Sequence, residues 1–557
     1  MLKDYFEVPN KPAIKSGNVL SCDFTDHETF IPQPLDFTRN TLATYVDCNG
    51  LIKVSGVTNT NLSPPEDFAT DFNSNPVSGT AVNNPDGTIT FTNSTSNGAN
   101  VNLSNRNITV GKTYQIKFTI SNYVQGNFRM SVGNQTTASV TTGNGTYIFY
   151  VTYNSGNSSN YFYTGNSTFT VSDISVKEVD LNIPRIDYLT EIGKAKELQK
   201  PSLLLEPQST NVITYSEDFS RQNTPWNTTQ NSVNFEYNST TAPDNETKAA
   251  KISKTSTRIY GSFFTGQTIT SAVDYSWSCF FKAGTHSVFT LQLTQGDTEF
   301  KAYFDLDNQA SGMYTGSATT KIENYGNGWF RCSLAGISST TDLSVRFNLG
   351  LAYTTSNENW PSASDGEGLF GYIWGAQLEQ QNYATSYIPT SGSTVTRNGE
   401  VCNNAGQLGV FNNNEGVLYA EIARISNNAF YELMAISNGN TNYQNLVSLG
   451  FDANNNEIWY RAKLNNTDLI VAAGAPIAPQ NEFIKIAIKY KSGDSKVYLN
   501  GVLIDSTTTV ATTSAEFTTF DFNFVNIYPF YGKVREIKAF RRALTDTELI
   551  ELTNNIV

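Results

Sequence analysis

Hydrophobic and polar residues alternate through much of the chain, most clearly between residues 213 and 380. Tyr275, Trp277, Cys279 and Phe281 occupy every second position, with Ser or another small group between several of them. Period-two alternation is typical of strands that bury one face, and Gly-, Asn- and Thr-rich turns separate these runs. We therefore predict a β-sandwich of jelly-roll type over residues 213–380.

The segment 57–180 repeats this plan. Tyr114, Ile116 and Phe118 alternate with polar residues, and a Glu-Asp-Phe triplet near the start occurs again at the start of the later segment. The spacing between corresponding strands differs in the two copies, which is a difference of loop length that sandwiches tolerate. The chain is thus predicted to contain two related jelly rolls.

The tail, residues 411–557, predicts a third sandwich. Ile484, Ile486 and Ile488 alternate with polar or small residues, and Asn500-Gly501 is a hairpin-turn signature. Thr545 with Glu548 predicts a capping box at a short final helix. The stretches KVYLNGVLI and YGKVREIKAFRRALTDTEL make this part similar to the laminin-G-like, concanavalin-type lectin fold.

The predicted fold class is all-β, with tandem β-sandwiches (two jelly rolls plus a concanavalin/laminin-G-like sandwich) on a small N-terminal anchor. The expected divisions are an anchor or collar at 1–56, an inserted jelly-roll carbohydrate-binding-like domain at 57–180, a collar return and linker at 181–212, a second such jelly roll at 213–380, a linker at 381–410 and the laminin-G-like lectin domain at 411–557.

Composition and charge narrow the function classes. The chain has 557 residues, 12% of them aromatic and 16% charged, with a formal net charge of −13. No Lys/Arg cluster is present, so we expect no nucleic-acid binding, which needs a basic patch. No apolar run reaches the ~20 residues that cross a bilayer, so membrane insertion is not expected. The N-terminus has no apolar core of a secretory signal peptide.

Several motifs together resemble one group of proteins. FTR, ATYVD.NGLI, PR.DY, LLLEPQSTN, YSEDF and WGAQLE…YATSYIPTSGSTVTR occur in this order between residues 37 and 397. The series resembles virion proteins of tailed phages, of the tail-fibre or carbohydrate-binding-module type. In similar proteins the NGLI and PR.DY pieces lie close together, whereas here residues 63–180 separate them. The resemblance therefore implies that the first jelly roll is an insertion in a small collar.

This resemblance also implies a role and partners. We expect a phage virion structural protein, a fibre or receptor-binding adhesin, assembled in the host cytoplasm and located in the virion. Its N-terminal region would bind other virion proteins, its sandwiches would bind host surface glycans, and it would form a homotrimer. Two alternatives stay open: a capsid or tail decoration protein with no glycan binding, or a bacterial surface lectin, which would need an export signal.

No residues suggest catalysis, so we expect no enzyme and name no catalytic residue. The two histidines, His27 and His286, are far apart and have no ligand-spaced Cys or carboxylate neighbours. The acidic string 546–551 departs from the Glu-x-Asp-x-x-Glu pattern of glycosidases with this fold and falls on the predicted final helix, where acids favour the N-terminus.

Glycan binding needs flat aromatic faces with a few polar groups on loops. The polar loop 353–367 offers Tyr353, Trp360 and Asp365, and the tail offers Tyr528 and Tyr531. The alternative for Trp360 is an anchor that packs within its loop or at a subunit contact.

Asp305 and Asp307 are candidates for a structural Ca²⁺, because the carbohydrate-binding jelly rolls that this segment resembles often carry one and carboxylates are ligands for that ion. No other cofactor is expected.

Overall fold

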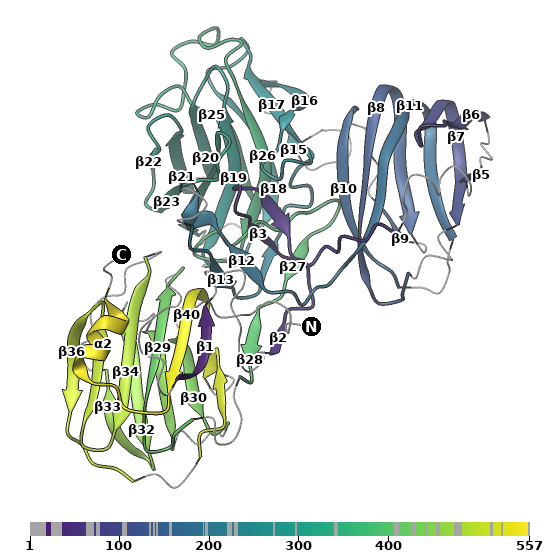
Figure 1. Ribbon diagram of the computed structural model, residues 1–557. Coiled ribbons are helices and arrows are strands. Elements are labelled where there is room, and N and C mark those ends of the chain that lie inside the picture. Colours follow the sequence, from purple (N-terminus) through teal and green to yellow (C-terminus); the bar gives the residue numbers. More distant parts are fainter. Residues whose placement is uncertain are drawn as a thin grey trace.

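The computed structural model describes residues 18–23, 36–62, 72–73, 78–102, 108–132, 135–137, 140, 143–154, 159–192, 194, 199–219, 226–227, 232–270, 273–295, 298–338, 344–405, 411–425, 431–439, 444–452, 457–472, 482–512, 516–524 and 527–554. Within these ranges the regular structure is almost entirely β, and the one α-helix is α2 (Asp546–Thr553). The strands form antiparallel sheets, which confirms the predicted all-β fold of tandem sandwiches (Figure 1). In the described part of the chain no helix has the length and hydropathy needed to span a bilayer.

The first sandwich is formed by β5 (Phe72–Asn73), β6 (Ser78–Asn83), β7 (Ile89–Asn102), β8 (Thr113–Val132), β9 (Gln135–Thr136), β10 (Gly145–Thr152) and β11 (Ser159–Val179). These strands form one hydrogen-bonded network, in the order β10-β8-β11-β7-β5, with β6 on β7 and β9 on β8.

The long strand β8 bends back on itself to enclose the core of the first sandwich. The ring centroids of Phe118 and Phe128 are 4.8 Å apart, whereas a straight strand of that length would separate them by ~33 Å. Between them Asn122 and Gly126 have φ angles of 53° and 99°, a conformation that asparagine and glycine tolerate best. The bend therefore makes one strand contribute to both sides of the core.

The second sandwich consists of two six-stranded sheets. One contains β15 (Trp226–Asn227), β18 (Gly261–Thr268), β25 (Ser344–Leu351), β20 (Val288–Gln295), β21 (Thr298–Asp305) and β22 (Ala310–Thr315), in that order. The other contains β16 (Val233–Thr241), β17 (Lys248–Lys254), β26 (Phe370–Glu379), β19 (Tyr275–Ala283), β24 (Trp329–Ile337) and β23 (Thr319–Asn324). The alternating residues predicted to face inward, Tyr275, Trp277, Cys279 and Phe281, lie in the core between them.

The third sandwich has one five-stranded sheet, β33 (Thr467–Val471), β32 (Glu457–Leu464), β31 (Leu446–Asp452), β30 (Tyr431–Ser437) and β37 (Thr519–Asp521). The facing sheet contains β40 (Gly532–Phe540), β29 (Glu415–Ala423), β34 (Ile484–Lys491), β35 (Ser495–Leu499) and β36 (Val502–Thr507). The hydroxyl of Thr545 accepts a hydrogen bond from the Glu548 backbone, and the Glu548 carboxylate accepts one from the Thr545 backbone. The predicted capping box of α2 is therefore confirmed.

The segments between the sandwiches form the collar, which we define as residues 36–56, 181–211 and 381–405. Its strand pairs are β2 (Asp36–Thr38) with β28 (Val401–Asn403), β3 (Thr44–Val46) with β4 (Ile52–Val54), and β14 (Ser209–Asn211) with β27 (Val395–Arg397). β12 (Arg185–Asp187) and β13 (Ser202–Leu205) extend the sheet of β40, and β1 (Asn18–Asp23) also pairs with β40. Parts of the expected anchor and collar thus add strands to the third sandwich.

The two ends of the first sandwich leave the collar side by side. Val57 and Val179 form an isolated bridge, and the backbone N–H of Asp180 donates to the carbonyl of Gly56 at 2.9 Å. Adjacent ends let a whole domain be inserted at one turn without distorting the host.

A buried charge cluster holds the collar together. Arg39, Arg185, Arg397, Glu206 and Glu400 are all buried. Arg185 donates to Glu400 at 2.7 Å and to Glu206 at 2.8 Å, Arg39 donates to Glu400 at 3.0 Å, and Arg397 pairs with Glu206. Burial raises the pKa of Glu206, but Arg397 and Arg185 outweigh it and hold that pKa well below its usual range.

This cluster joins four of the sequence motifs found between residues 37 and 397. Arg39 belongs to FTR, Arg185 to PR.DY, Glu206 to LLLEP and Arg397 to the end of STVTR. Those motifs therefore belong to the collar, the scaffold between the sandwiches. The third sandwich is attached to the same region, because Lys533 pairs with Asp187 at 2.8 Å.

Candidate functional site

The loop 353–367 closes one end of the second sandwich, and Trp360 is buried in it, with 4% of its surface exposed. Its ring lies 5.2 Å from that of Tyr353 and 5.3 Å from that of His286, between centroids. Gly366, with φ of 71°, crosses the indole so closely that a Cβ would lie 2.1 Å from a ring carbon. Trp360 therefore anchors the loop and has no free face for a sugar. This is the alternative role considered for it above, in place of sugar binding.

The other predicted residues of this loop serve its own conformation. The Asp365 carboxylate accepts a hydrogen bond from the backbone of Ser362 at 3.0 Å. Tyr353 is half-buried against Trp360. His286, at the base of the loop, contacts the carbonyl of Ala352 through Nε2 at 2.6 Å, and burial lowers its pKa. His27 lies outside the described residues.

Beside this loop, the outer face of the sheet β18-β25-β20-β21 carries a hollow of about 220 Å³. Its polar lining residues are Tyr260, Ser262, Thr290, Gln292, Thr294, Lys301, Asn348, Glu358 and Asn359. Strand alternation produces this face, since Leu291 and Leu293 of β20 enter the core while Gln292 between them points outward.

Small residues form the floor of the hollow. In the register of the sheet, Gly350 pairs with Ser262 on one side and with Thr290 on the other. A Cβ on Gly350 would lie 2.3 Å from the carbonyl oxygen of Gly261. A larger residue at Gly350 would therefore clash with the neighbouring strand, so this position between Ser262 and Thr290 carries no side chain.

Amide and charged groups surround this floor. Gln292 donates to one oxygen of Glu358 and Lys301 pairs with the other, both at 2.9 Å. Asn348 donates to Thr294 at 2.7 Å. These bonds use the amide N–H groups, and the side-chain carbonyl oxygens of Gln292 and Asn348 accept no hydrogen bond from any described residue. Pre-positioned acceptors of this kind suit hydroxyl-rich ligands.

Tyrosines lie next to these polar groups. Tyr260 lines the hollow, and the rings of Tyr303 and Tyr314 are 5.4 Å apart on the neighbouring strands. The Tyr314 hydroxyl donates to the carbonyl of Thr354, which attaches the loop to the sheet, and burial raises the pKa of Tyr314. The loop 353–367, which the sequence suggested as a sugar-binding loop, therefore borders the hollow. Its polar contact with the sheet there is made by Glu358, which binds Gln292 and Lys301.

In the third sandwich, Tyr528 and Tyr531 have different surroundings. Tyr528 lies 5.6 Å from Tyr431, whose ring is 5.0 Å from that of Trp459; together they cover the outer face of β30 and β32. Burial raises the pKa of Tyr531, and the charge of Glu400 in the collar adds to the effect. Trp459 was not among the residues predicted from the sequence. Its neighbours Ile458 and Tyr460 are both buried, so the strand alternation places the Trp459 side chain on the outer face.

The candidate calcium ligands cap a turn. Asp305 accepts hydrogen bonds from the backbones of Asp307 and Asn308, each at 3.2 Å, and from the Asn308 side chain at 2.8 Å. Among the described residues, no group of three or more His, Cys, Asp or Glu side chains could hold a metal ion.

The acidic string at the C-terminus is engaged in ion pairs. Asp546 pairs with Lys496 at 2.7 Å, and Glu548 both closes the capping box and pairs with Arg542. Both side chains therefore have structural partners on or beside α2.

Comparison with known proteins identifies the third sandwich. Residues 406–550 match the family model Laminin_G_3, described as the concanavalin A-like lectin/glucanases superfamily. This part of the chain is thus similar to concanavalin-type domains, as the resemblance of its KVYLNGVLI and YGKVREIKAFRRALTDTEL stretches implied. No curated protein matches the chain.

Solved structures with similarity to parts of the chain include three proteins from different organisms. The Ruminococcus gnavus IT-sialidase CBM40 bound to α2,3-sialyllactose is 18% identical, covering 27% of this chain and 94% of its own, with a TM-score of 0.24. Domain 4 of a GH43 extracellular arabinanase from Geobacillus stearothermophilus, in complex with arabinotriose, is 17% identical over 31% and 83%, with a TM-score of 0.23. Domains LG4-5 of the mouse laminin α1 chain are 12% identical over 52% and 90%, with a TM-score of 0.19.

Proposed function

We propose that the chain is a non-enzymatic, glycan-binding protein of a phage virion, a fibre or receptor-binding adhesin that attaches to host surface sugars. The observation that carries glycan binding is the hollow on the second sandwich, where Gln292 and Asn348 present amide oxygens beside Tyr260. The lectin-superfamily match of residues 406–550 supports the same class of function.

The virion role is supported by the motif series that the charge cluster joins. In this role the collar of the protein would attach to other virion proteins, and the sandwiches would face outward. Single sugar sites bind weakly, and several copies raise avidity without new contacts. A homotrimer is accordingly part of the proposal, and light scattering of the purified chain measures it directly.

A glycan microarray probed with the full chain tests the binding role. Gln292→Ala should lower binding of the glycans captured by the second sandwich about tenfold, because one hydrogen-bond partner of the ligand is lost. Lys251→Ala, at a half-buried position on the opposite sheet of the same sandwich, is the control. Capture of no glycan by the wild-type oligomer, or equal capture by both variants, would contradict the proposed site.

One observation favours a second candidate, a decoration protein with no glycan binding. The motifs that resemble those of phage virion proteins include buried scaffold residues such as Arg185 and Glu206 and none of the residues that line the hollow. Locating the protein on purified particles while finding no sugar binding would favour this candidate.

A further inference from the structure

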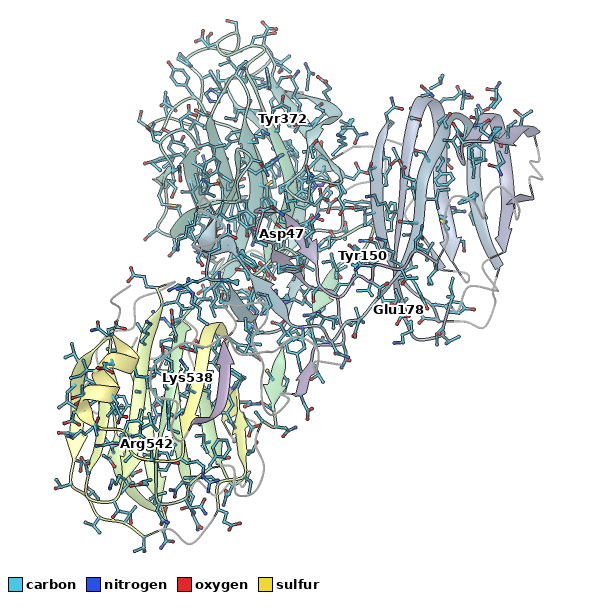
Figure 2. All side chains as sticks on the ribbon, in the orientation of Figure 1. Asp47, Tyr150, Glu178, Tyr372, Lys538 and Arg542 are labelled. Carbon is cyan, nitrogen blue, oxygen red and sulfur yellow. The ribbon has the colours of Figure 1, made fainter. Side chains whose placement is uncertain are left out.

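A larger pocket, of about 800 Å³, lies between the first and second sandwiches. The outward face of β8 and β10 forms one wall, the start of the second sandwich and the loop 244–247 form another, and the β3–β4 hairpin closes the side. Figure 2 labels Tyr150 of β10 on the side of the first sandwich that faces the second. Its volume is in the range of pockets that hold small organic ligands.

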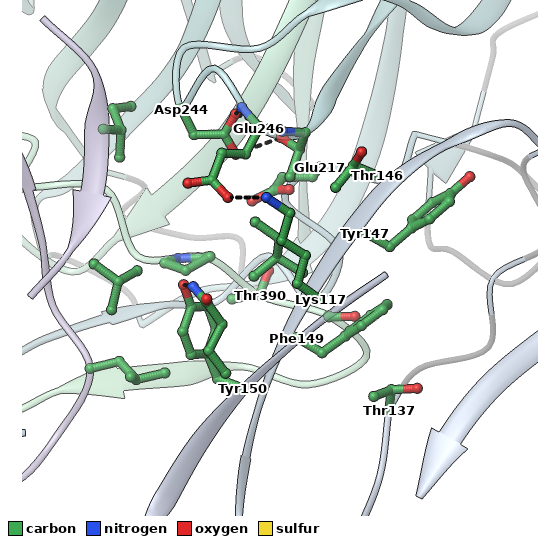
Figure 3. A pocket seen from close by; sticks show the side chains of 18 of the residues that line it. Lys117, Thr137, Thr146, Tyr147, Phe149, Tyr150, Glu217, Asp244, Glu246 and Thr390 are labelled. Atoms are coloured by element: carbon green, nitrogen blue, oxygen red, sulfur yellow. Dashed lines mark hydrogen bonds and ion pairs between the residues drawn. The ribbon is translucent and has the colours of Figure 1, made fainter. Parts of the chain in front are cut away.

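One ion-pair network crosses the pocket. The Glu246 carboxylate binds Lys117 of β8 at 2.8 Å and Lys53 of the hairpin at 3.2 Å. Figure 3 shows the Lys117–Glu246 pair with Tyr150 and Glu217 beside it. Burial raises the pKa of Glu246, but the two lysines outweigh it and leave the pKa lowered, so this carboxylate is ionised and compensated.

Two other polar groups in the pocket have capacity left for a ligand. The Tyr150 hydroxyl accepts a hydrogen bond from Gln115 at 2.9 Å, and its own proton has no acceptor among the described residues. Glu217 accepts from Tyr387 at 2.9 Å through one oxygen, and its second oxygen has no partner within the described ranges. Both residues are partly exposed and line the same cavity.

The charges of the lining cancel. Four lysines and five carboxylates line the pocket, and burial together with the charge of Asp244 raises the pKa of Glu217 to about 8. At neutral pH Glu217 therefore holds a proton, and the four remaining carboxylates face the four lysines; burial also raises the pKa of Asp244 among them. An uncharged ligand loses no ion–water interactions on entering, whereas a charged one would meet no net counter-charge.

From this geometry we propose that the pocket binds an uncharged oligosaccharide segment, held by hydrogen bonds to Tyr150 and Glu217. A sugar hydroxyl accepts the Tyr150 proton, and the carboxyl of Glu217 donates to a second hydroxyl. Tyr215, half-exposed on the same lining, offers a ring face. This site rests on the proposed glycan-binding function, but it is separate from the hollow on the second sandwich.

The test uses the full chain on a microarray of neutral, anionic and amino-sugar glycans, followed by calorimetry with the best neutral ligand. Tyr150→Phe and Glu217→Ala should each weaken that binding about tenfold, the value of one buried hydrogen bond. Glu217→Gln, which keeps a donor and an acceptor without charge, should bind within about twofold of wild type. Circular dichroism and thermal unfolding check that each variant is folded.

The hollow and the pocket give different outcomes. If Gln292→Ala alone weakens binding, the pocket proposal is overturned and the proposed function stands. Loss in the Tyr150 and Glu217→Ala variants, with Gln292→Ala unchanged, supports the pocket. A preference for anionic or amino sugars, equal loss in Glu217→Gln and Glu217→Ala, or no neutral glycan bound at all would each refute it.

Discussion

At the scale of single residues, the buried ions are the most consequential side chains in the molecule. Arg185 contacts both Glu206 and Glu400, and none of the three side chains is exposed beyond 5%. Taking charges out of water is costly, so such a group is tolerated only while every ion keeps its partners. These residues are strand-end and loop positions in sequence, and their burial could not be inferred from alternation.

Arg185→Met should destabilise the protein by about 3–5 kcal/mol, because two buried carboxylates would lose their shared partner. Urea unfolding measures the free energy. Lys251→Met is the matched control, since its partner Glu236 is 64% exposed and exposed pairs contribute about 0–1 kcal/mol. Similar losses of unfolding free energy in the two variants would show that the buried cluster contributes no more to stability than an exposed ion pair.

Glu217 should make stability depend on pH. Its pKa is raised to about 8 in the folded protein, so between its unfolded value near 4.5 and pH 8 the folded state holds a proton that the unfolded state has released. Stability from this group is complete below that window and is lost as pH rises through it, with a change on the order of 5 kcal/mol for a shift from 4.5 to about 8.

The comparison that isolates this effect is wild type against Glu217→Gln, unfolded by urea at pH 5 and pH 8.5. The wild type should lose stability relative to the variant at the higher pH. Glu236→Gln is the control, because the pKa of Glu236 is lowered by its hydrogen bond with Lys251 and its titration lies below the window. A difference that does not change with pH would contradict the assignment.

At the scale of elements, local sequence decided most of the structure. The hairpin turn Asn500-Gly501 has φ angles of 50° and 83°, which fits the turn type that an Asn-Gly pair favours. The fold-over of β8 was not predictable, because a strand of twenty residues alternates in the same way whether it is straight or bent.

Thr545→Ala should destabilise the third sandwich by about 1 kcal/mol, because the first turn of α2 loses its capping hydroxyl. Leu549 would remain buried beneath the helix, so the fold should persist. Thermal unfolding detects the change, and Thr547→Ala, at an exposed position in the same turn, should have no comparable effect. Equal shifts would rule out the cap as the cause.

At the scale of the whole molecule, polar contacts between described residues link the first sandwich to the second. Glu246 links Lys117 and Lys53, and Asn238 donates to the Tyr147 hydroxyl at 3.3 Å. Figure 1 shows the first sandwich as a separate lobe joined to the collar by its two adjacent ends. We therefore expect the Glu246 network to contribute to its orientation.

Glu246→Gln should loosen this arrangement, because both lysines lose their counter-charge. Small-angle scattering should show a larger radius of gyration for the variant, and high salt should shift the wild type in the same direction. Glu236→Gln removes an ion pair inside the second sandwich and should leave the radius unchanged. An unaltered profile for Glu246→Gln would mean that other contacts set the orientation.

The sequence by itself determined the all-β class, the inward faces of the strands, the concanavalin-type tail and the capped final helix. The class, the inward faces and the cap depend on residues a few positions apart, where alternation and capping rules act, whereas the concanavalin-type tail was inferred from the resemblance of the KVYLNGVLI and YGKVREIKAFRRALTDTEL stretches. Tertiary structure decided that Arg39, Arg185 and Arg397 meet, that Trp360 is an anchor, and that a pocket forms beside Tyr150. Those features arise where separately folded segments come into contact, and no local periodicity records which distant surfaces will face each other.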